Sequence, residues 1–141
     1  MCTEQQLKQA TKDFFGRYWN KQNGDPPEWG EHWYFDGTIP NHDKRGCYAL
    51  YAGEEIIYIG CGLGKSFGIY EGSGLGARLN EYWEVNKDKH NVKKYKPKTD
   101  WNELTSIQTI GFDKEYYHLA AALEVFLIER LKPEKNVMHK D

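Results

Sequence analysis

Apolar and polar positions near the start of the chain repeat with the period of a helix. The apolar side chains recur every three or four residues, at Leu7, Ala10, Phe14 and Tyr18. Thr3 and Gln6 precede them with the spacing of a capping box. The pattern therefore predicts an amphipathic helix that begins after Thr3 and ends near Asn20.

A second helix is predicted near the end of the chain, in the run LAAALEVFLIER at residues 119–130. Asp113 has the character of its N-cap, and Pro133 requires it to stop beforehand. Glu124 is unusual because it interrupts an otherwise apolar run. A carboxylate in such a setting is costly to bury unless it is paired, protonated or bound to a metal.

Three segments have the composition of strands. They are CYALYA at 47–52, EIIYIG at 55–60 and LTSIQTIGF at 104–112. The first two flank a tight turn at Gly53 and Glu54, which indicates a hairpin. If the register follows this turn, Tyr48 pairs near Ile59 and Ala49 near Tyr58, and the two tyrosines face each other. Tyrosine pairs are ordinary in sheets, so the pattern alone favours a structural role.

The remaining segments are a short helix and two loops. Leu75 to about Asn86 has helical spacing, and residues 87–98 form a lysine-dense loop. Residues 21–45 hold most of the prolines, together with four large rings: Trp29, Trp33, Tyr34 and Phe35. We expect these rings to fold back over the core, the alternative being a surface on which bases stack.

The order of elements is helix, hairpin, helix, strand, helix, which is typical of a small α/β or α+β domain. A chain of 141 residues suits one core. Within it we expect residues 1–45 to form a helix and an aromatic-rich loop packed on the core. Residues 46–141 then form the principal unit.

Composition narrows the classes of function. The net charge of -2 gives no support for nucleic-acid binding by the whole surface, so such a site needs a local patch. No run of about 18 apolar residues exists, and the polar N-terminus lacks a signal-peptide pattern. We therefore expect a cytoplasmic protein without membrane contact. The odd number of cysteines, without a CxxC pair, argues against a disulfide framework or structural zinc.

Two sequence patterns could indicate other chemistry. IIYIGCGLGKS places Gly64, Lys65 and Ser66 after a strand, as in a phosphate-binding P-loop, but Ile59 occupies the position where that motif requires glycine. The five histidines have no HxH or HExxH spacing, which disfavours a histidine-built zinc centre.

Four separated motifs together resemble the GIY-YIG nuclease superfamily. GCYALYAGEEIIYIG matches its signature, with Gly46-Cys47-Tyr48 and Tyr58-Ile59-Gly60 as the two tripeptides. GARL at 76–79 is similar to the helix arginine motif, and ALE at 122–124, followed by KPEKN at 132–136, is similar to the closing segment. The resemblance covers roughly residues 46 to 136. It implies a small GIY-YIG-like domain, in which helices flank a three-stranded antiparallel sheet and the N-terminal helix is an addition.

The resemblance also implies an activity and a set of residues. Members of this superfamily are DNA endonucleases that use Mg²⁺ or Mn²⁺, and Glu124 would be the metal ligand. Arg78 would hold the scissile phosphate, although an exposed arginine is more often a surface ion-pair partner. Tyr48 and Tyr58 would activate water, with Tyr48 as general base. That role requires a tyrosine pKa below the ordinary value of about 10.

Supporting roles follow from the same resemblance. Tyr82, one turn after Arg78, would share the proton relay. Asn136 would tie the end of the fold to the hairpin, and Gly60 would leave room beside the substrate or a helix. Cys61 stands where several relatives carry lysine, and Lys65 could supply that charge. The glycine-rich connection at 61–76 is longer than usual and could close on DNA.

The DNA would lie along the basic segment. Its candidate phosphate contacts are Lys87, Lys89, Lys93, Lys94, Lys96 and Lys98, together with Lys65. The alternative is that this lysine-dense segment is an ordinary solvated loop without a binding role. Cutting both strands of a duplex would call for a homodimer, two successive cuts or a partner protein. The rival function is a catalytically inert module that binds DNA or protein.

Overall fold

The computed structural model describes residues 1–63, 74–87 and 93–138. In chain order the elements are α1 (Glu4–Tyr18), η1 (Lys21–Asn23), β1 (Arg45–Ala52), β2 (Glu55–Gly62), α2 (Gly74–Leu79), β3 (Trp83–Val85), β4 (Tyr95–Pro97), η3 (Thr99–Trp101), β5 (Ser106–Phe112), η4 (Lys114–Tyr116), α3 (Tyr117–Leu131) and α4 (Glu134–Met138).

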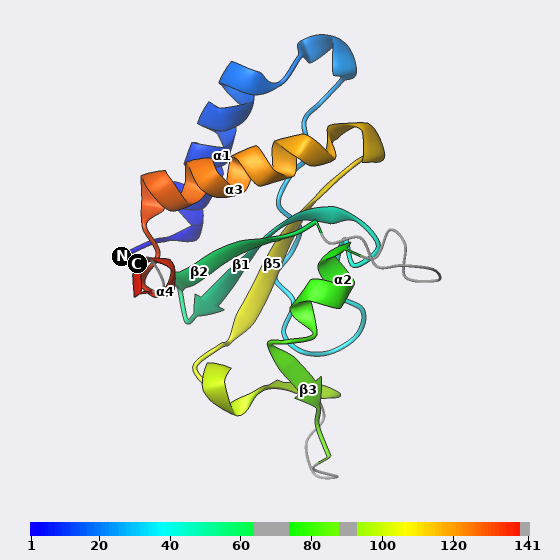
Figure 1. Cartoon of the computed structure of the whole chain (residues 1–141). Coiled ribbons are helices and arrows are strands. Elements are labelled where there is room, and N and C mark those ends of the chain that lie inside the picture. The colour runs from blue at the N-terminus through cyan, green and yellow to red at the C-terminus, as the bar shows by residue number, and fades with distance from the viewer. Residues whose placement is uncertain (64–73, 88–92, 139–141) are drawn as a thin grey trace.

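The fold is a mixed α+β arrangement around a three-stranded antiparallel sheet of order β2-β1-β5. Helices α1 and α3 lie side by side over one face of this sheet, and α2 lies against the other face (Figure 1). The predicted class and the predicted central sheet are thereby confirmed. Since β1 is the middle strand, its side chains enter both layers of the core.

Alternation along β1 divides the core into two clusters. Cys47, Ala49 and Tyr51 point to the side of α1 and α3. Tyr48 and Leu50 point to the side of α2. All five are buried, which is the expected pattern for a central strand covered on both faces.

A β-bulge corrects the predicted hairpin register. Tyr48 pairs with Gly60, and the register shifts between Leu50 and Tyr51, so that Ile57 has no directly paired residue. Ile57 and Tyr58 consequently both contribute to the α2-side cluster. The predicted pairing of Tyr48 with Ile59 was wrong because the sequence carries no visible signal of the extra residue. The bulge places Tyr48 and Tyr58 on the same face.

The middle of the chain also differs from the prediction. Helix α2 ends at Leu79 rather than near Asn86, and Trp83–Val85 instead pairs with Tyr95–Pro97 in a two-stranded hairpin. The lysine-dense segment is therefore partly a strand, and not only a loop. Trp83 and Tyr95 pack edge to face across this hairpin, with 4.5 Å between their ring centroids, a contact that favours strand over helix.

The predicted terminal helices are present, with different ends. Helix α1 has the capping box of Thr3 and Gln6 and ends at Tyr18. Asp113 precedes the short helix η4 and makes no side-chain cap there, so α3 begins only at Tyr117. Its end at Leu131 lies before Pro133, as predicted.

The aromatic loop folds back only in part. Trp33 and Phe35 are buried, and Trp33 pairs with Ile107 at the open edge of β5. Tyr34 is 56% exposed, so the prediction was wrong for this ring. None of the helices in the described parts of the chain is long and apolar enough to cross a membrane.

Candidate active site

Three tyrosines and one tryptophan form an aromatic cluster on the α2 side of the sheet. The ring of Tyr48 lies 6.3 Å from that of Tyr58 and 5.5 Å from that of Tyr82. Trp101, from the short helix η3, packs edge-on against Tyr58 at 5.8 Å and Tyr82 at 4.9 Å. The three tyrosines singled out in the sequence thus meet, and Trp101 joins them without any motif that could have signalled its place.

The hydroxyls of Tyr48 and Tyr82 are hydrogen-bonded at 2.7 Å, and both rings are buried. Burial raises the pKa of Tyr48 above its ordinary value, and the neighbouring Tyr82 and Arg78 only partly offset this. Burial, and then the charge of Tyr48, also raise the pKa of Tyr82. Both residues are therefore neutral at neutral pH in the free protein, whereas a general base would need a lowered pKa.

Tyr58 is the partly buried member of the cluster. Burial raises the pKa of its hydroxyl, Arg78 lowers it and Glu124 raises it again. The charges of both the arginine and the carboxylate therefore act on Tyr58. Because its ring is the least buried of the three, Tyr58 is the tyrosine best placed to meet a substrate.

Gly60 gives space to the ring of Tyr48, and its role beside a substrate or a helix stays a prediction. It is the strand partner of Tyr48, and a Cβ added at Gly60 would overlap the Tyr48 hydroxyl and ring. The aromatic ring therefore lies across the bare backbone of the glycine, as in other sheets where a large ring covers a strand glycine. Glycine here fixes the position of the Tyr48 hydroxyl.

Arg78 lies in the last turn of α2, beside the tyrosines. Its guanidinium interacts with the Tyr48 hydroxyl and donates a hydrogen bond from Nη1 to Glu81 at 3.2 Å. The Arg78 side chain remains 47% exposed. The ion pair with Glu81 is the surface contact expected of an ordinary arginine. Exposed pairs of this kind are weak, so the guanidinium can exchange Glu81 for a phosphate.

Glu124 of α3 lies near the edge strand β2, where its charge acts on Tyr58 and Cys61. It is partly buried and interacts electrostatically with Tyr58. The Glu124 carboxylate also acts on the neighbouring Cys61 thiol. Burial, followed by the negative charge of Glu124, raises the pKa of Cys61 to about 12. Cys61, at the position where the resemblance places lysine in several relatives, is therefore a neutral thiol.

The donor set suits a hard cation. Mg²⁺ and Mn²⁺ prefer oxygen ligands, and one carboxylate completed by water and phosphate oxygens is a common magnesium site. Glu124 offers such an oxygen, and the neutral Cys61 thiol would not compete as a ligand. No group of three or more potential ligating side chains occurs in the described segments. Glu124 is the ligand that the sequence resemblance implies.

Asn136 ties α4 to the central part of β2. Its side-chain oxygen accepts a hydrogen bond from the Ile59 amide, and its side-chain nitrogen donates to the Ile59 carbonyl, both at 2.8 Å. Ile59 lies between Tyr58 and Gly60, so this contact fixes the strand where the aromatic cluster depends on it. The contact has the form that the sequence resemblance implies.

The predicted DNA-contacting lysines lie along and beside the β3–β4 hairpin. Lys87, Lys93, Lys94 and Lys96 are exposed, whereas Lys98 is partly buried. Lys96 forms an ion pair with Glu84 at 3.7 Å. Lys65 and Lys89, together with most of the glycine-rich connection, lie outside the described residues. The hairpin follows Tyr82 directly and projects away from the main sheet (Figure 1).

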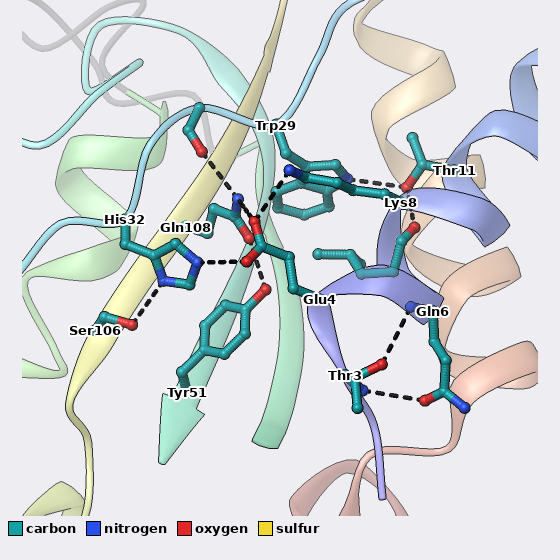
Figure 2. Close-up of polar contacts among 12 residues, drawn as sticks. Thr3, Glu4, Gln6, Lys8, Thr11, Trp29, His32, Tyr51, Ser106 and Gln108 are labelled. Carbon is teal, nitrogen blue, oxygen red and sulfur yellow. Dashed lines mark hydrogen bonds and ion pairs between the residues drawn. The ribbon is translucent and has the colours of Figure 1, made fainter. Parts of the chain in front are cut away.

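A second polar network was missed by the sequence analysis. Figure 2 shows Glu4 of α1 at its centre, accepting hydrogen bonds from His32 and from Gln108 at 3.0 Å each. His32 also contacts Ser106 at 2.8 Å, and Tyr51 donates to Gln108 at 2.6 Å. No sequence spacing signals this network, because its members come from α1, the loop and two strands.

Comparison with known proteins gave no match. No family model matches the sequence, and searches of curated proteins and of solved structures found none significantly similar to this chain.

Proposed function

We propose that this protein is a divalent-metal-dependent DNA endonuclease of the GIY-YIG type. The observation that carries the proposal is that separated sequence segments bring Tyr48, Tyr58, Arg78 and Tyr82 together on one face of the sheet. Glu124 of α3 is near enough for its charge to act on Tyr58. Two hairpin tyrosines, an arginine and a carboxylate form a set suited to hydrolysis of a phosphodiester bond.

In this proposal Arg78 leaves Glu81 and binds the scissile phosphate. There the planar guanidinium of Arg78 neutralises negative charge that develops in the transition state. Glu124, beside the neutral Cys61 thiol, binds Mg²⁺ or Mn²⁺. The bound ion would supply electrophilic assistance to the phosphate. A cation and Arg78 near the tyrosines would favour the phenolate and oppose the effect of burial on their pKa.

Proton transfer from the attacking water is assigned to the tyrosines. Tyr48 is the general base by the sequence resemblance, and its bond to Tyr82 offers a path for the proton away from the site. Tyr58, the least buried of the three, lies where it can orient the water.

Binding of the DNA backbone is assigned to the β3–β4 hairpin. Lys87, Lys93, Lys94, Lys96 and Lys98 are close in sequence to Tyr82 and would contact phosphates without reading bases. We therefore expect cutting that is weakly specific or directed by DNA structure, with a homodimer, two successive cuts or a partner protein needed to sever a duplex.

The second candidate is a domain with the same fold that binds DNA or protein without cutting. The raised pKa of the buried Tyr48 favours this candidate, since it opposes the role of general base. The two candidates differ in one property only: whether the protein cleaves DNA when a divalent metal is present.

The test is cleavage of supercoiled plasmid and of branched DNA by the wild type and by Glu124→Ala. Each reaction is run with Mg²⁺, with Mn²⁺ and with a chelator. Metal-dependent nicking by the wild type, lost in Glu124→Ala while the melting temperature is kept, is the expected result. Binding of DNA without cutting under every condition would select the inert module instead.

A further inference from the structure

A cavity of about 570 Å³ lies between α1 and residues 26–29, away from the aromatic tyrosine cluster. The residues that line it include three aromatic rings and two prolines: Phe15, Trp19, Trp29, Pro26 and Pro27. The volume falls within the usual range of sites for small ligands, roughly 300–1,000 Å³. The nuclease proposal gives this cavity no role.

The tryptophans that line the cavity are held in place by their own hydrogen bonds. The Trp19 indole donates to the Gly24 carbonyl at 2.9 Å. The Trp29 indole donates at 2.9 Å to the hydroxyl of Thr11, which in turn donates to the Leu7 carbonyl. Figure 2 shows Trp29 and Thr11 in this contact. The polar atoms of both rings are satisfied, so their flat faces are pre-organised for stacking.

The charges around the cavity favour an anion. Lys8, Lys12 and Lys21 line it, against the single carboxylate of Glu28. Lys8 is already paired with Glu4 at 3.1 Å. Lys12 and Lys21 have no ion pair with any residue in the described part of the chain. A ligand that combines a planar aromatic ring with a negative group would match both features.

We propose that this cavity binds a free mononucleotide, with its base stacked on Trp19 or Trp29 and its phosphate on Lys12 and Lys21. The cavity and the tyrosine cluster lie on different sides of the sheet, which favours a free ligand over a strand of DNA. Trp29 and Phe15 pack with the α1 and α3 side of the sheet, whereas Tyr48 and Tyr82 belong to the α2 side. A strand held at the tyrosines would have to pass round the sheet to reach the cavity. The inference does not depend on the nuclease activity.

The test is isothermal titration of the full chain with adenosine monophosphate, adenosine, inorganic phosphate and a single-stranded oligonucleotide. The proposal predicts saturable binding of adenosine monophosphate and much weaker binding of adenosine and of inorganic phosphate. The double variant Lys12→Gln/Lys21→Gln is expected to weaken binding by roughly 3- to 10-fold, as two exposed charge contacts would.

The matched control is Lys114→Gln/Lys132→Gln, which makes the same change of charge at two exposed positions outside the cavity and outside the proposed DNA contacts. It should leave binding of adenosine monophosphate unchanged. An equal loss in both double variants would show a general charge effect and overturn the proposal. Equal affinity for adenosine and adenosine monophosphate would also overturn the proposal. Binding of the oligonucleotide without binding of adenosine monophosphate would overturn it as well.

A steric variant separates loss of binding from loss of folding. Gly16 lines the cavity, and a Cβ placed there meets no atom within 4 Å. Gly16→Gln therefore fits the helix and raises its propensity, while its side chain enters the cavity mouth. We expect an unchanged or higher melting temperature with binding of adenosine monophosphate abolished. Full binding by this variant would contradict the proposed position of the ligand.

Discussion

At the scale of single residues, Gly60 is the position on which the site geometry depends most. Gly60→Ala places a methyl group inside the Tyr48 ring, so the ring or the strand must shift. We expect a loss of about 1–3 kcal/mol of unfolding free energy, as for other overpacked cores, measured by urea denaturation. Cleavage should fall together with stability, because the Tyr48 hydroxyl moves.

Gly16→Ala is the matched control for Gly60→Ala. The added methyl group meets no atom within 4 Å at the mouth of the cavity beside α1, and alanine favours the helix. This variant should therefore be more stable than the wild type by about 0.5–1 kcal/mol. Destabilisation of the same size in both variants would show that the contact between Gly60 and Tyr48 is not the cause.

The tyrosines also set a pH dependence. Burial keeps the pKa of Tyr48 and Tyr82 above the ordinary value, so the phenolate is a minor species at neutral pH and increases as pH rises. If a tyrosine is the general base, log kcat/KM should rise by about one unit per pH unit from about pH 7 to about pH 9. A profile that is flat over this range at saturating metal would assign the base to another group.

At the scale of elements, one side chain connects α4 to the sheet. Asn136→Asp keeps the acceptor for the Ile59 amide but turns a second acceptor toward the Ile59 carbonyl. We expect a loss of about 1–3 kcal/mol in urea denaturation, because a buried carbonyl loses its donor. Hydrogen exchange should report faster opening at Ile59 and its neighbours. Unchanged exchange there would show that α4 does not hold the strand.

The attachment of α1 depends on Glu4. Partial burial opposes ionisation, but hydrogen bonds from His32, Lys8 and Gln108 outweigh it and lower the pKa of Glu4 from 4.5 to about 2. A lowered carboxyl pKa stabilises the fold above the unfolded value, and that stabilisation disappears as pH falls toward the folded value. The melting temperature should therefore drop as pH is lowered from 4.5 toward about 2.

Two variants isolate this effect. Glu4→Gln should be less stable than the wild type at neutral pH and should lose part of the acid dependence. Glu31→Gln, a change of the same charge at an exposed loop position, should follow the wild type. Identical acid profiles for Glu4→Gln and the wild type would exclude Glu4 as a source of the pH dependence.

At the scale of the whole molecule, the sequence predicted what depends on local periodicity. The amphipathic α1, the apolar α3 and the three strands of the main sheet all lie close to their predicted positions. The prediction failed where distant residues decide the structure. The bulge at Ile57 and the pairing of Trp83–Val85 with Tyr95–Pro97 depend on contacts across strands, which period alone does not encode.

The candidate site likewise contains residues that the sequence predicted and contacts that it did not. Tyr48, Tyr58, Arg78 and Glu124 could be named from sequence because they belong to motifs. Trp101, the effect of Glu124 on Cys61 and the position of Tyr48 over Gly60 could not, since each needs the sheet register or the approach of a distant segment. The motifs therefore identify the candidate residues, and tertiary packing sets their orientation and their pKa.

The most direct measurement of the central claim is single-turnover DNA cleavage as a function of Mg²⁺ concentration. Wild type, Glu124→Gln and the exposed control Glu54→Gln are compared on the best substrate from the plasmid and branched-DNA assays. We predict a saturable dependence on Mg²⁺ for the wild type and for Glu54→Gln, with cleavage abolished or shifted to far higher metal concentration in Glu124→Gln. The same metal dependence in all three proteins, or cleavage of no DNA by the wild type, would contradict the claim.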